Sequence, residues 1–184
     1  MNLHSSRSLS RVSTLMVLGL AVASTVATLG GCHTGSGGAY SAETLAANTA
    51  SLNQAKAAFF DGWTKTAGTN FTTDKLGKVF DNSENFVSFD GMSQDKTVIR
   101  GWKAYSGIWG PGMNGFTNAS LSEAKSISTW IEGDTAITAS IARIYGEMPN
   151  GQKLDVQGHL TLGWRRIGSQ WRIVHEHMSM GVKE

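Results

Sequence analysis

The chain has 184 residues, of which 40% are hydrophobic and 16% are charged. This composition fits one folded domain with a short additional segment and excludes a largely disordered chain. The formal charge of +2 comes entirely from Arg7 and Arg11, because no acidic residue precedes Glu43, and without a stripe of Lys and Arg the sequence lacks the basic surface that nucleic-acid binding needs.

The first residues have the pattern of an export signal. A weakly basic start is followed by an apolar run over residues 14–29, which is shorter than the roughly 20 residues of a membrane-spanning helix. The run ends in Leu29-Gly30-Gly31-Cys32, which resembles the lipobox of bacterial lipoproteins, where the cysteine is lipidated and becomes the first residue. We therefore expect a signal peptide over residues 1–31, lipidation of Cys32, and a flexible, Gly- and Ser-rich tether over residues 32–42.

Cys32 is the only cysteine of the chain, so it forms no internal disulfide. The alternative is an incidental cysteine in a signal peptide that is cleaved earlier, after Ala23 or Ala27. By analogy with lipoprotein sorting, His33 stands where an aspartate would retain a lipoprotein in the inner membrane. This favours an outer-membrane anchor facing the periplasm, with the lipid as the only contact with the membrane.

The expected domain covers residues 43–184 and starts with two helical patterns. Ser41 can cap a helix whose apolar residues recur at helical spacing as far as Trp63, with Gly68 marking its end. Residues 73–80 then suggest a short second helix that begins at Thr73.

Residues 85–90 alternate in the manner of a strand. Ser93 is a plausible cap for a third helix with Asp95 in its first turn, and Gly110-Pro111-Gly112 should end it. The apolar face of this predicted helix carries Val98, Trp102, Tyr105 and Trp109.

From Phe116 onward the apolar residues alternate. Turn signals at residues 132–134, 149–151 and 168–169 divide this part into four antiparallel strands. Helices followed by strands indicate an α+β domain, and one helical layer on a curved sheet is its simplest packing.

The order of elements and the closing motif Trp171-Arg172-Ile173-Val174-His175-Glu176-His177-Met178-Ser179 resemble the nuclear transport factor 2-like superfamily. The ending is similar to that of SnoaL-like proteins and of the calcium/calmodulin-dependent kinase association domain, and the resemblance covers roughly residues 43–179. It implies a cone-shaped, curved antiparallel sheet around about three N-terminal helices. It does not specify an activity, because this scaffold carries many functions.

The pairing of the last two strands determines which residues face the cone. If Gly168-Ser169 is a two-residue turn, Leu162 pairs with His175 and His159 with Met178. One face then carries Leu160, Leu162, Trp164, Trp171, Ile173, His175 and His177. The opposite face carries His159, Thr161, Arg165, Arg172, Val174, Glu176 and Met178.

Burial alone would turn the aromatic face toward the helices, but the resemblance favours the reverse. In ketosteroid isomerases and the association domain, the residue before the terminal serine faces the cone interior, and that residue is Met178 here. Glu176 would share this face, and the aromatic face would cover a homodimer interface. A one-residue bulge near the turn would reverse the assignment.

Four polar residues are candidates for the cone's chemistry. The resemblance matches Arg143 to a pocket arginine of the association domain, and its guanidinium could clamp an anion or a carbonyl, unless Glu176 or Asp90 pairs with it permanently. His159 could act as a general acid or base or be a structural histidine at the sheet rim. Asp90 could be a base or only a turn residue before Gly91.

The aromatic residues have two interpretations as well. Trp63, Tyr105 and Trp109, together with Met178, could form the pocket wall or simply belong to the core. His175 and His177 form an alternative pocket if the aromatic face turns inward.

We expect neither a metal nor a cofactor. His175 and His177 would lie about 6.7 Å apart along a strand, but the assumed pairing leaves them without a third ligand, since His159 falls on the other face. The glycine-rich turns typical of nucleotide binding are absent from the sequence.

Three functional hypotheses follow. The leading one is an exported, homodimeric lipoprotein that binds a small organic molecule, anionic or carbonyl-bearing, in its cone. The second is a cofactor-independent isomerase, dehydratase or hydrolase that uses Arg143, His159 and Glu176, although the steroid isomerase pattern of an aspartate base and a tyrosine–acid pair could not be placed. The third is a non-catalytic dimerisation or interaction module with a filled cone.

Overall fold

The computed structural model describes residues 41–93 and 98–181. The expected signal peptide (residues 1–31), Cys32 and nearly all of the tether (residues 32–42) lie outside the described residues, as does Asp95. Within the two described ranges, no helix has both the length and the apolar character needed to cross a bilayer.

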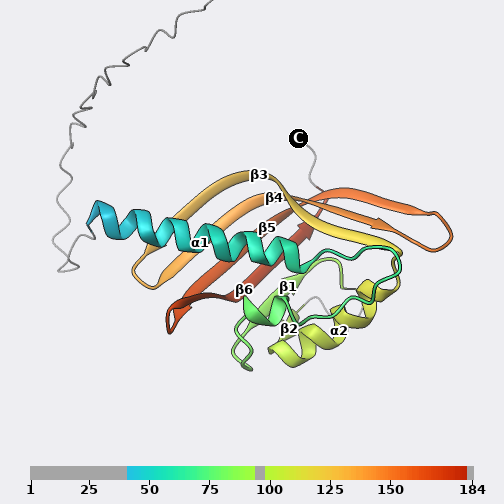
Figure 1. Ribbon diagram of the computed structural model, residues 1–184, viewed down its shortest axis with the longest axis horizontal. Coiled ribbons are helices and arrows are strands. Elements are labelled where there is room, and N and C mark those ends of the chain that lie inside the picture. The colour runs from blue at the N-terminus through green and yellow to red at the C-terminus, as the bar shows by residue number, and fades with distance from the viewer. Residues whose placement is uncertain (1–40, 94–97, 182–184) are drawn as a thin grey trace, which may run out of the picture. The chain divides into compact units, whose positions relative to one another are not determined.

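A curved sheet of six strands forms most of the domain (Figure 1), and its strand order is β2-β1-β6-β5-β4-β3. The strands are β1 (Val87–Asp90), β2 (Val98–Arg100), β3 (Asn118–Glu132), β4 (Thr135–Glu147), β5 (Lys153–Ile167) and β6 (Gln170–Met180). The four long C-terminal strands are confirmed. The sheet is mixed, because β1 runs parallel to β6 while all other neighbours are antiparallel.

The first helix, α1 (Ala42–Gly62), lies across the sheet. It is capped as predicted, since the Ser41 hydroxyl accepts a hydrogen bond from the Thr44 backbone N–H at 3.1 Å. It ends at Gly62, before the expected Gly68, because Lys65 and Ala119 exchange backbone hydrogen bonds of 2.8 and 3.0 Å. The second predicted helix is a single 3-10 turn, η1 (Leu76–Lys78).

The third predicted helix begins later than expected. Residues Val98–Arg100 form β2 and pair with β1, and α2 (Trp102–Asn114) starts after Gly101. Gly101 has a φ of 78°, a left-handed conformation that favours glycine. The helical spacing of Val98 with Trp102 was therefore misleading, since a sharp backbone change separates the two residues.

The motif Gly110-Pro111-Gly112 does not end α2, which continues to Asn114 with Pro111 inside it. A proline removes one helical hydrogen bond, but tertiary contacts hold this last turn. The Asn114 side chain accepts from the Phe71 backbone N–H at 2.8 Å and donates to the Phe71 carbonyl at 3.0 Å. Met113 is buried in the core beside it.

A bulge in β6 sets the face on which each C-terminal residue lies. Ile167 pairs with Gln170 across the expected two-residue turn, but the register shifts between Gly163 and Trp164, and no residue of β5 pairs with Val174. A bulge of one residue reverses the facing of everything beyond it.

The pairing beyond the bulge differs from the expectation. Leu162 pairs with Glu176, not with His175, and His159 pairs with Ser179, not with Met178. Trp171 and Ile173 before the bulge therefore share one face with Glu176 and Met178 after it.

The aromatic face is the inner one, so the prediction that it covers a dimer interface is wrong. Its side chains are all at most 3% exposed and comprise Leu160, Leu162, Trp164, Trp171 and Ile173. The helix α1 covers part of this face, since the Trp171 indole N–H donates to the Ser51 hydroxyl at 3.0 Å. Dimerisation stays a prediction and would use another surface.

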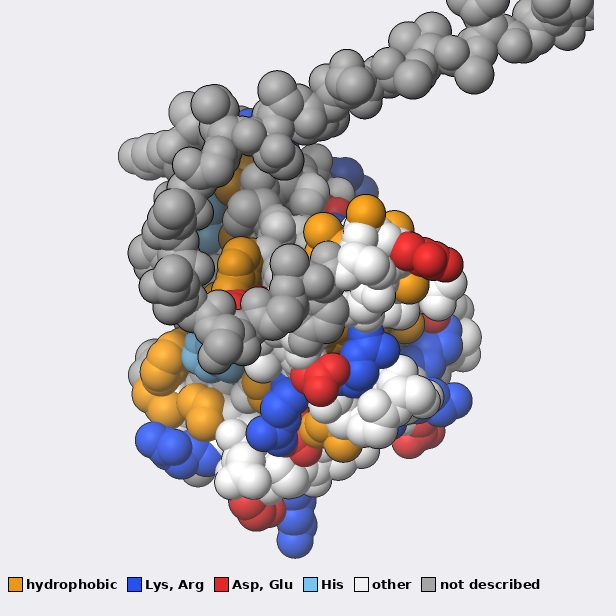
Figure 2. Space-filling model, turned by 90° about the vertical axis from the view of Figure 1, so that its left-hand side faces the viewer, with side chains coloured by type: hydrophobic (Ala, Val, Ile, Leu, Met, Phe, Trp, Pro, Cys, Tyr) orange, Lys and Arg blue, Asp and Glu red, His pale blue; other side chains and the backbone are white. Residues whose placement is uncertain are grey.

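The outer face of the sheet is partly apolar. Trp130 and Ile137, which pair on β3 and β4, are 50% and 46% exposed, and Phe89 on β1 is 44% exposed. On the side of the molecule seen in Figure 2, Lys and Arg side chains lie among Asp and Glu side chains.

Candidate functional site

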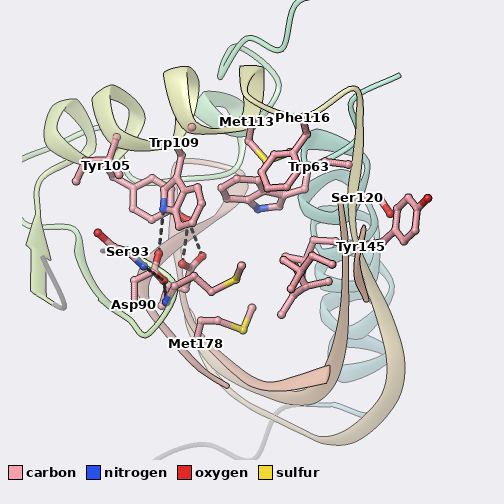
Figure 3. Close-up of a pocket in the computed structure, with 18 of the residues that line it drawn as sticks. Trp63, Asp90, Ser93, Tyr105, Trp109, Met113, Phe116, Ser120, Tyr145 and Met178 are labelled. Carbon is pink, nitrogen blue, oxygen red and sulfur yellow. Dashed lines mark hydrogen bonds between the residues drawn. The ribbon is translucent and has the colours of Figure 1, made fainter. Parts of the chain in front are cut away.

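A pocket of about 440 Å³ lies between α2 and the sheet (Figure 3). Its volume falls in the range of small-molecule sites. Most of its wall is apolar or aromatic, and the residues that line it are Trp63, Asp90, Met92, Ser93, Tyr105, Ile108, Trp109, Gly112, Met113, Phe116, Ala119, Ser120, Leu121, Ile144, Tyr145, Met148, Leu154, Glu176 and Met178.

Glu176 contributes a buried carboxyl group to this pocket. It is 3% exposed and sits on β6 directly beside Ser88 of β1. The Tyr105 hydroxyl donates to its two oxygens, at 2.8 Å for Oε1 and 3.0 Å for Oε2, and the Ser88 hydroxyl donates to Oε1 at 3.3 Å. Burial, and secondly the charge of Asp90, raise the pKa of Glu176 from 4.5 to about 8, and the two hydrogen bonds offset only part of this rise.

Asp90 contributes the second carboxyl group, from the end of β1 on the same strand face as Ser88. One oxygen, Oδ1, accepts from the backbone N–H groups of Met92 at 2.8 Å and Ser93 at 3.3 Å, and Oδ2 accepts from the Trp109 indole N–H at 2.9 Å. Burial raises the pKa of Asp90 above 3.8, while these three hydrogen bonds act in the opposite direction.

The two carboxyl groups are held by neighbouring residues of one helix face. Tyr105 and Trp109 lie one turn apart on α2, so one reaches Glu176 and the other Asp90 (Figure 3). Burial and the charges of Glu176 and Asp90 raise the pKa of the Tyr105 hydroxyl well above 10.0, so it stays a donor.

The two carboxyl groups lie in different environments, which give them different pKa values. Because the charge of Asp90 is one cause of the raised pKa of Glu176, Asp90 ionises first. Near neutral pH the carboxyl of Glu176 is therefore largely protonated, and Asp90 is the more readily ionised of the two. Pairs of acids whose environments push their pKa values apart are suited to act as base and acid.

The structure brings together some of the residues expected from the sequence. Asp90, Glu176 and Met178 line the pocket with the aromatic side chains of Trp63, Tyr105 and Trp109. The structure also adds residues that the sequence analysis did not assign to the site, namely Ser88, Ser93, Met113, Phe116 and Ile144. The sequence did contain a signal for Ser88, because it lies two residues before Asp90 on a strand and therefore on the same face.

Arg143 lies outside the pocket, which corrects its predicted place in the cone. Its guanidinium forms a bidentate pair with Asp155 at 2.7 and 2.6 Å, and its side chain is 53% exposed. The partner is neither Glu176 nor Asp90. Alternation along β4 explains the placement, because Ala142 and Ile144, the neighbours of Arg143 on this strand, face inward and are both buried.

The three C-terminal histidines also lie outside the pocket. His159 and His177 are exposed, and the pairs His177–Thr161 and His175–Gly163 place all three rings on the outer face of the sheet. The assumption that His159 and the other two lie on opposite faces is therefore wrong, again because of the bulge. Even so, within residues 41–93 and 98–181 no three His, Cys, Asp or Glu side chains are grouped so that they could hold a metal ion.

Comparison with solved structures shows the same fold. A nuclear transport factor 2-like superfamily protein of Salmonella enterica is 19% identical, with a TM-score of 0.58 over 78% of this chain and 95% of that one. A proposed scytalone dehydratase of Novosphingobium aromaticivorans is 10% identical, with a TM-score of 0.62 over 76% and 88%. A proposed ketosteroid isomerase of Shewanella frigidimarina is 21% identical, with a TM-score of 0.50 over 71% and 92%.

No curated protein matches the chain significantly. The family model of the SnoaL-like domain, however, matches residues 57–183. This range contains every strand of the sheet, α2 and both pocket carboxyls. The chain therefore belongs to the SnoaL-like domain family and has the α+β fold of the nuclear transport factor 2-like superfamily.

Proposed function

We propose that the pocket binds a small, neutral, largely apolar organic molecule with a carbonyl group, and that Asp90 and Glu176 exchange protons with it. The observation that supports this proposal is the pair of buried carboxyls in one apolar pocket, with the pKa of Glu176 raised to about 8. General acids and bases are most effective when their pKa lies near the working pH.

The charges of the pocket favour a neutral ligand over an anion. Among its described lining residues there is no Lys, Arg or His, and the guanidinium of Arg143 is engaged with Asp155 elsewhere. An anion would meet the negative charge of Asp90 in a poorly solvated site, where like charges repel strongly. The anionic ligand that Arg143 suggested is therefore not part of this proposal.

In this proposal each carboxyl group has a separate role. Asp90, as a carboxylate, removes a proton from the carbon next to the ligand's carbonyl, and Glu176, in its protonated form, donates a hydrogen bond or a proton to the carbonyl oxygen. Glu176 Oε1 accepts from both Tyr105 and Ser88, whereas Oε2 accepts from Tyr105 alone, which leaves Oε2 as the better position for the acidic proton. In a β,γ-unsaturated ketone, return of the proton to the γ-carbon gives isomerisation. In a β-hydroxy ketone, loss of the hydroxyl as water, with a proton supplied by Glu176, gives dehydration.

Binding and proton exchange can be tested with one ketone, 1-tetralone. We expect it to quench tryptophan fluorescence on binding and to exchange the hydrogens next to its carbonyl for deuterium in D2O, followed by NMR. Tetrahydronaphthoate, a carboxylate on the same ring system, should bind at least about tenfold more weakly because of the like charge.

The variant Asp90→Asn separates catalysis from binding. It keeps the size of the side chain but removes the base, so exchange should fall by at least about a hundredfold while 1-tetralone still binds. Asp155→Asn, which alters a carboxylate outside the pocket, is the matched control and should leave exchange unchanged. Binding without exchange in the unaltered protein would instead indicate a carrier or sensor, and no binding of 1-tetralone would contradict the proposal.

We propose further that the domain is exported and anchored through a lipid on Cys32. The support is the apolar run that ends in Leu29-Gly30-Gly31-Cys32 and the absence of any other cysteine in the sequence. Cys32→Ser should move the protein from the membrane fraction to the soluble fraction. Unchanged fractionation together with an unmodified N-terminus by mass spectrometry would contradict the anchor.

A further inference from the structure

Trp63 carries a hydrogen-bond donor that is buried and has no partner. Its side chain is 6% exposed, and within residues 41–93 and 98–181 its indole nitrogen is the only buried side-chain nitrogen or oxygen without a hydrogen bond. Buried polar groups are nearly always paired, because an unpaired donor destabilises the fold. Trp63 also lines the pocket, so the exception occurs where a ligand would bind.

The aromatic neighbours of Trp63 fix the direction of this N–H group. The ring stacks on Phe71 at 6.0 Å between centroids and makes edge contacts with Tyr105 at 6.2 Å and Trp109 at 5.6 Å. Figure 3 shows the indole nitrogen on the edge of the ring that faces the open part of the pocket. A ring packed on several sides cannot easily rotate to find another acceptor.

The position of this donor relative to the carboxyls sets how far apart the polar groups of a ligand must be. Tyr105 contacts Trp63 with its ring and Glu176 with its hydroxyl, and Trp109 contacts Trp63 with its ring and Asp90 with its N–H. Trp63 is therefore about one aromatic ring away from both carboxyls. A ligand that reaches Glu176 with one end would reach Trp63 with a group on the far side of a ring system.

We propose that Trp63 determines specificity by donating a hydrogen bond to a second oxygen of the ligand, at the end opposite the reacting carbonyl. The inference rests on the proposed function and narrows its substrate class to ring-containing ketones with two separated oxygen functions. The indole N–H donates only, so the second function must be an acceptor such as a carbonyl, hydroxyl or ether oxygen.

Two ketones of the same shape isolate this hydrogen bond. In 6-methoxy-1-tetralone the far end of the ring carries an ether oxygen, and in 6-ethyl-1-tetralone a methylene group replaces it. We expect the methoxy compound to bind about fivefold more tightly to the unaltered protein, as one net hydrogen bond to a buried donor would give. In Trp63→Phe this ratio should fall to about one, because the ring remains but the donor is lost.

Trp171→Phe is the matched control, because it removes a buried indole N–H that lies outside the pocket and is already bonded to Ser51. The fivefold preference should persist in this variant. A ratio near one in the unaltered protein, or an equal preference in Trp63→Phe, would overturn the role of Trp63 while leaving the proposed function intact. If neither ketone binds, the proposed function fails, and this inference fails with it.

A measurement on the unaltered protein covers the case in which Trp63→Phe does not fold. The indole N–H resonances can be followed by heteronuclear NMR during titration with each ketone. The Trp63 resonance should move downfield with the methoxy compound and not with the ethyl compound. Equal shifts with both compounds would contradict a hydrogen bond to the second oxygen.

Discussion

Replacing Glu176 with glutamine is expected to remove most of the pH dependence of the protein's stability between about pH 5 and 8. In the native state the carboxyl of Glu176 keeps its proton up to about pH 8, whereas its ordinary pKa is 4.5. Between these values the folded chain holds a proton that the unfolded chain has released. The free energy of unfolding must therefore fall as the pH rises through this interval.

The size of the effect follows from the same linkage. One proton difference corresponds to a slope of about 1.4 kcal/mol per pH unit, which is large for a protein with a total stability of about 5–15 kcal/mol. Asp90 adds to the slope at the acid end, because its pKa is raised too. Asp155 does not contribute in this interval, since Arg143 lowers its pKa from 3.8.

The measurement is a series of urea unfolding curves at pH 5, 6, 7 and 8. The unaltered protein should show a midpoint that decreases steadily, and Glu176→Gln should show a nearly constant one, because glutamine stays neutral and can still accept from Tyr105. Glu132→Gln, at an exposed position at the end of β3, is the control and should keep the original slope. A midpoint that is constant or rises with pH in the unaltered protein would show that the pKa of Glu176 is not raised in the folded state.

The second large effect is a loss of stability, which is expected when Trp164 is replaced with alanine. This residue is 1% exposed, and its indole N–H donates to the Thr138 hydroxyl at 3.0 Å across the inner face of the sheet. Trp164→Ala leaves a cavity and an unpaired hydroxyl, so we expect a loss of about 3–5 kcal/mol in the free energy of unfolding. Such a loss is a large part of the stability of an ordinary domain.

Trp130→Ala provides the matched comparison on the outer face, where the tryptophan is 50% exposed. The loss in the free energy of unfolding should stay below about 1 kcal/mol, since substitutions at exposed sites have small effects on stability. Urea unfolding of both variants decides which face of the sheet is the core. If Trp130→Ala is as damaging as Trp164→Ala, and the loss depends on protein concentration, then a second copy of the chain covers the outer face.

The candidate site was only partly predictable from the sequence. Glu176 and Met178 were expected in the cone by resemblance, and they line the pocket, but the register assumed for them was wrong by one residue. Arg143 was expected in the cone by resemblance, with Glu176 or Asp90 as the alternative acceptor for its guanidinium. Asp155 on the neighbouring strand supplies that acceptor, and such a cross-strand partner is visible only when the register of β4 with β5 is known.

Local sequence patterns were enough to predict those elements that depend on residues close together in the chain. The cap at Ser41, the alternation of β3 to β6 and the turn at Gly168-Ser169 depend on residues close together in the chain, so they could be read directly. The closing motif similarly carried the resemblance to the nuclear transport factor 2-like superfamily. The apolar run before Cys32 gave the expectation of export in the same way, and it lies outside the described residues.

Tertiary structure alone decided which side chains meet in the pocket. The bulge at Val174 has no marker in the sequence, because it arises where β6 must present both Ile173 and Glu176 to the same side of the sheet. The pairing of β1 with β6 then brings Ser88 beside Glu176, and α2 adds Tyr105 and Trp109. The raised pKa of Glu176 follows from this burial, which is a property of packing between distant segments and not of any one of them.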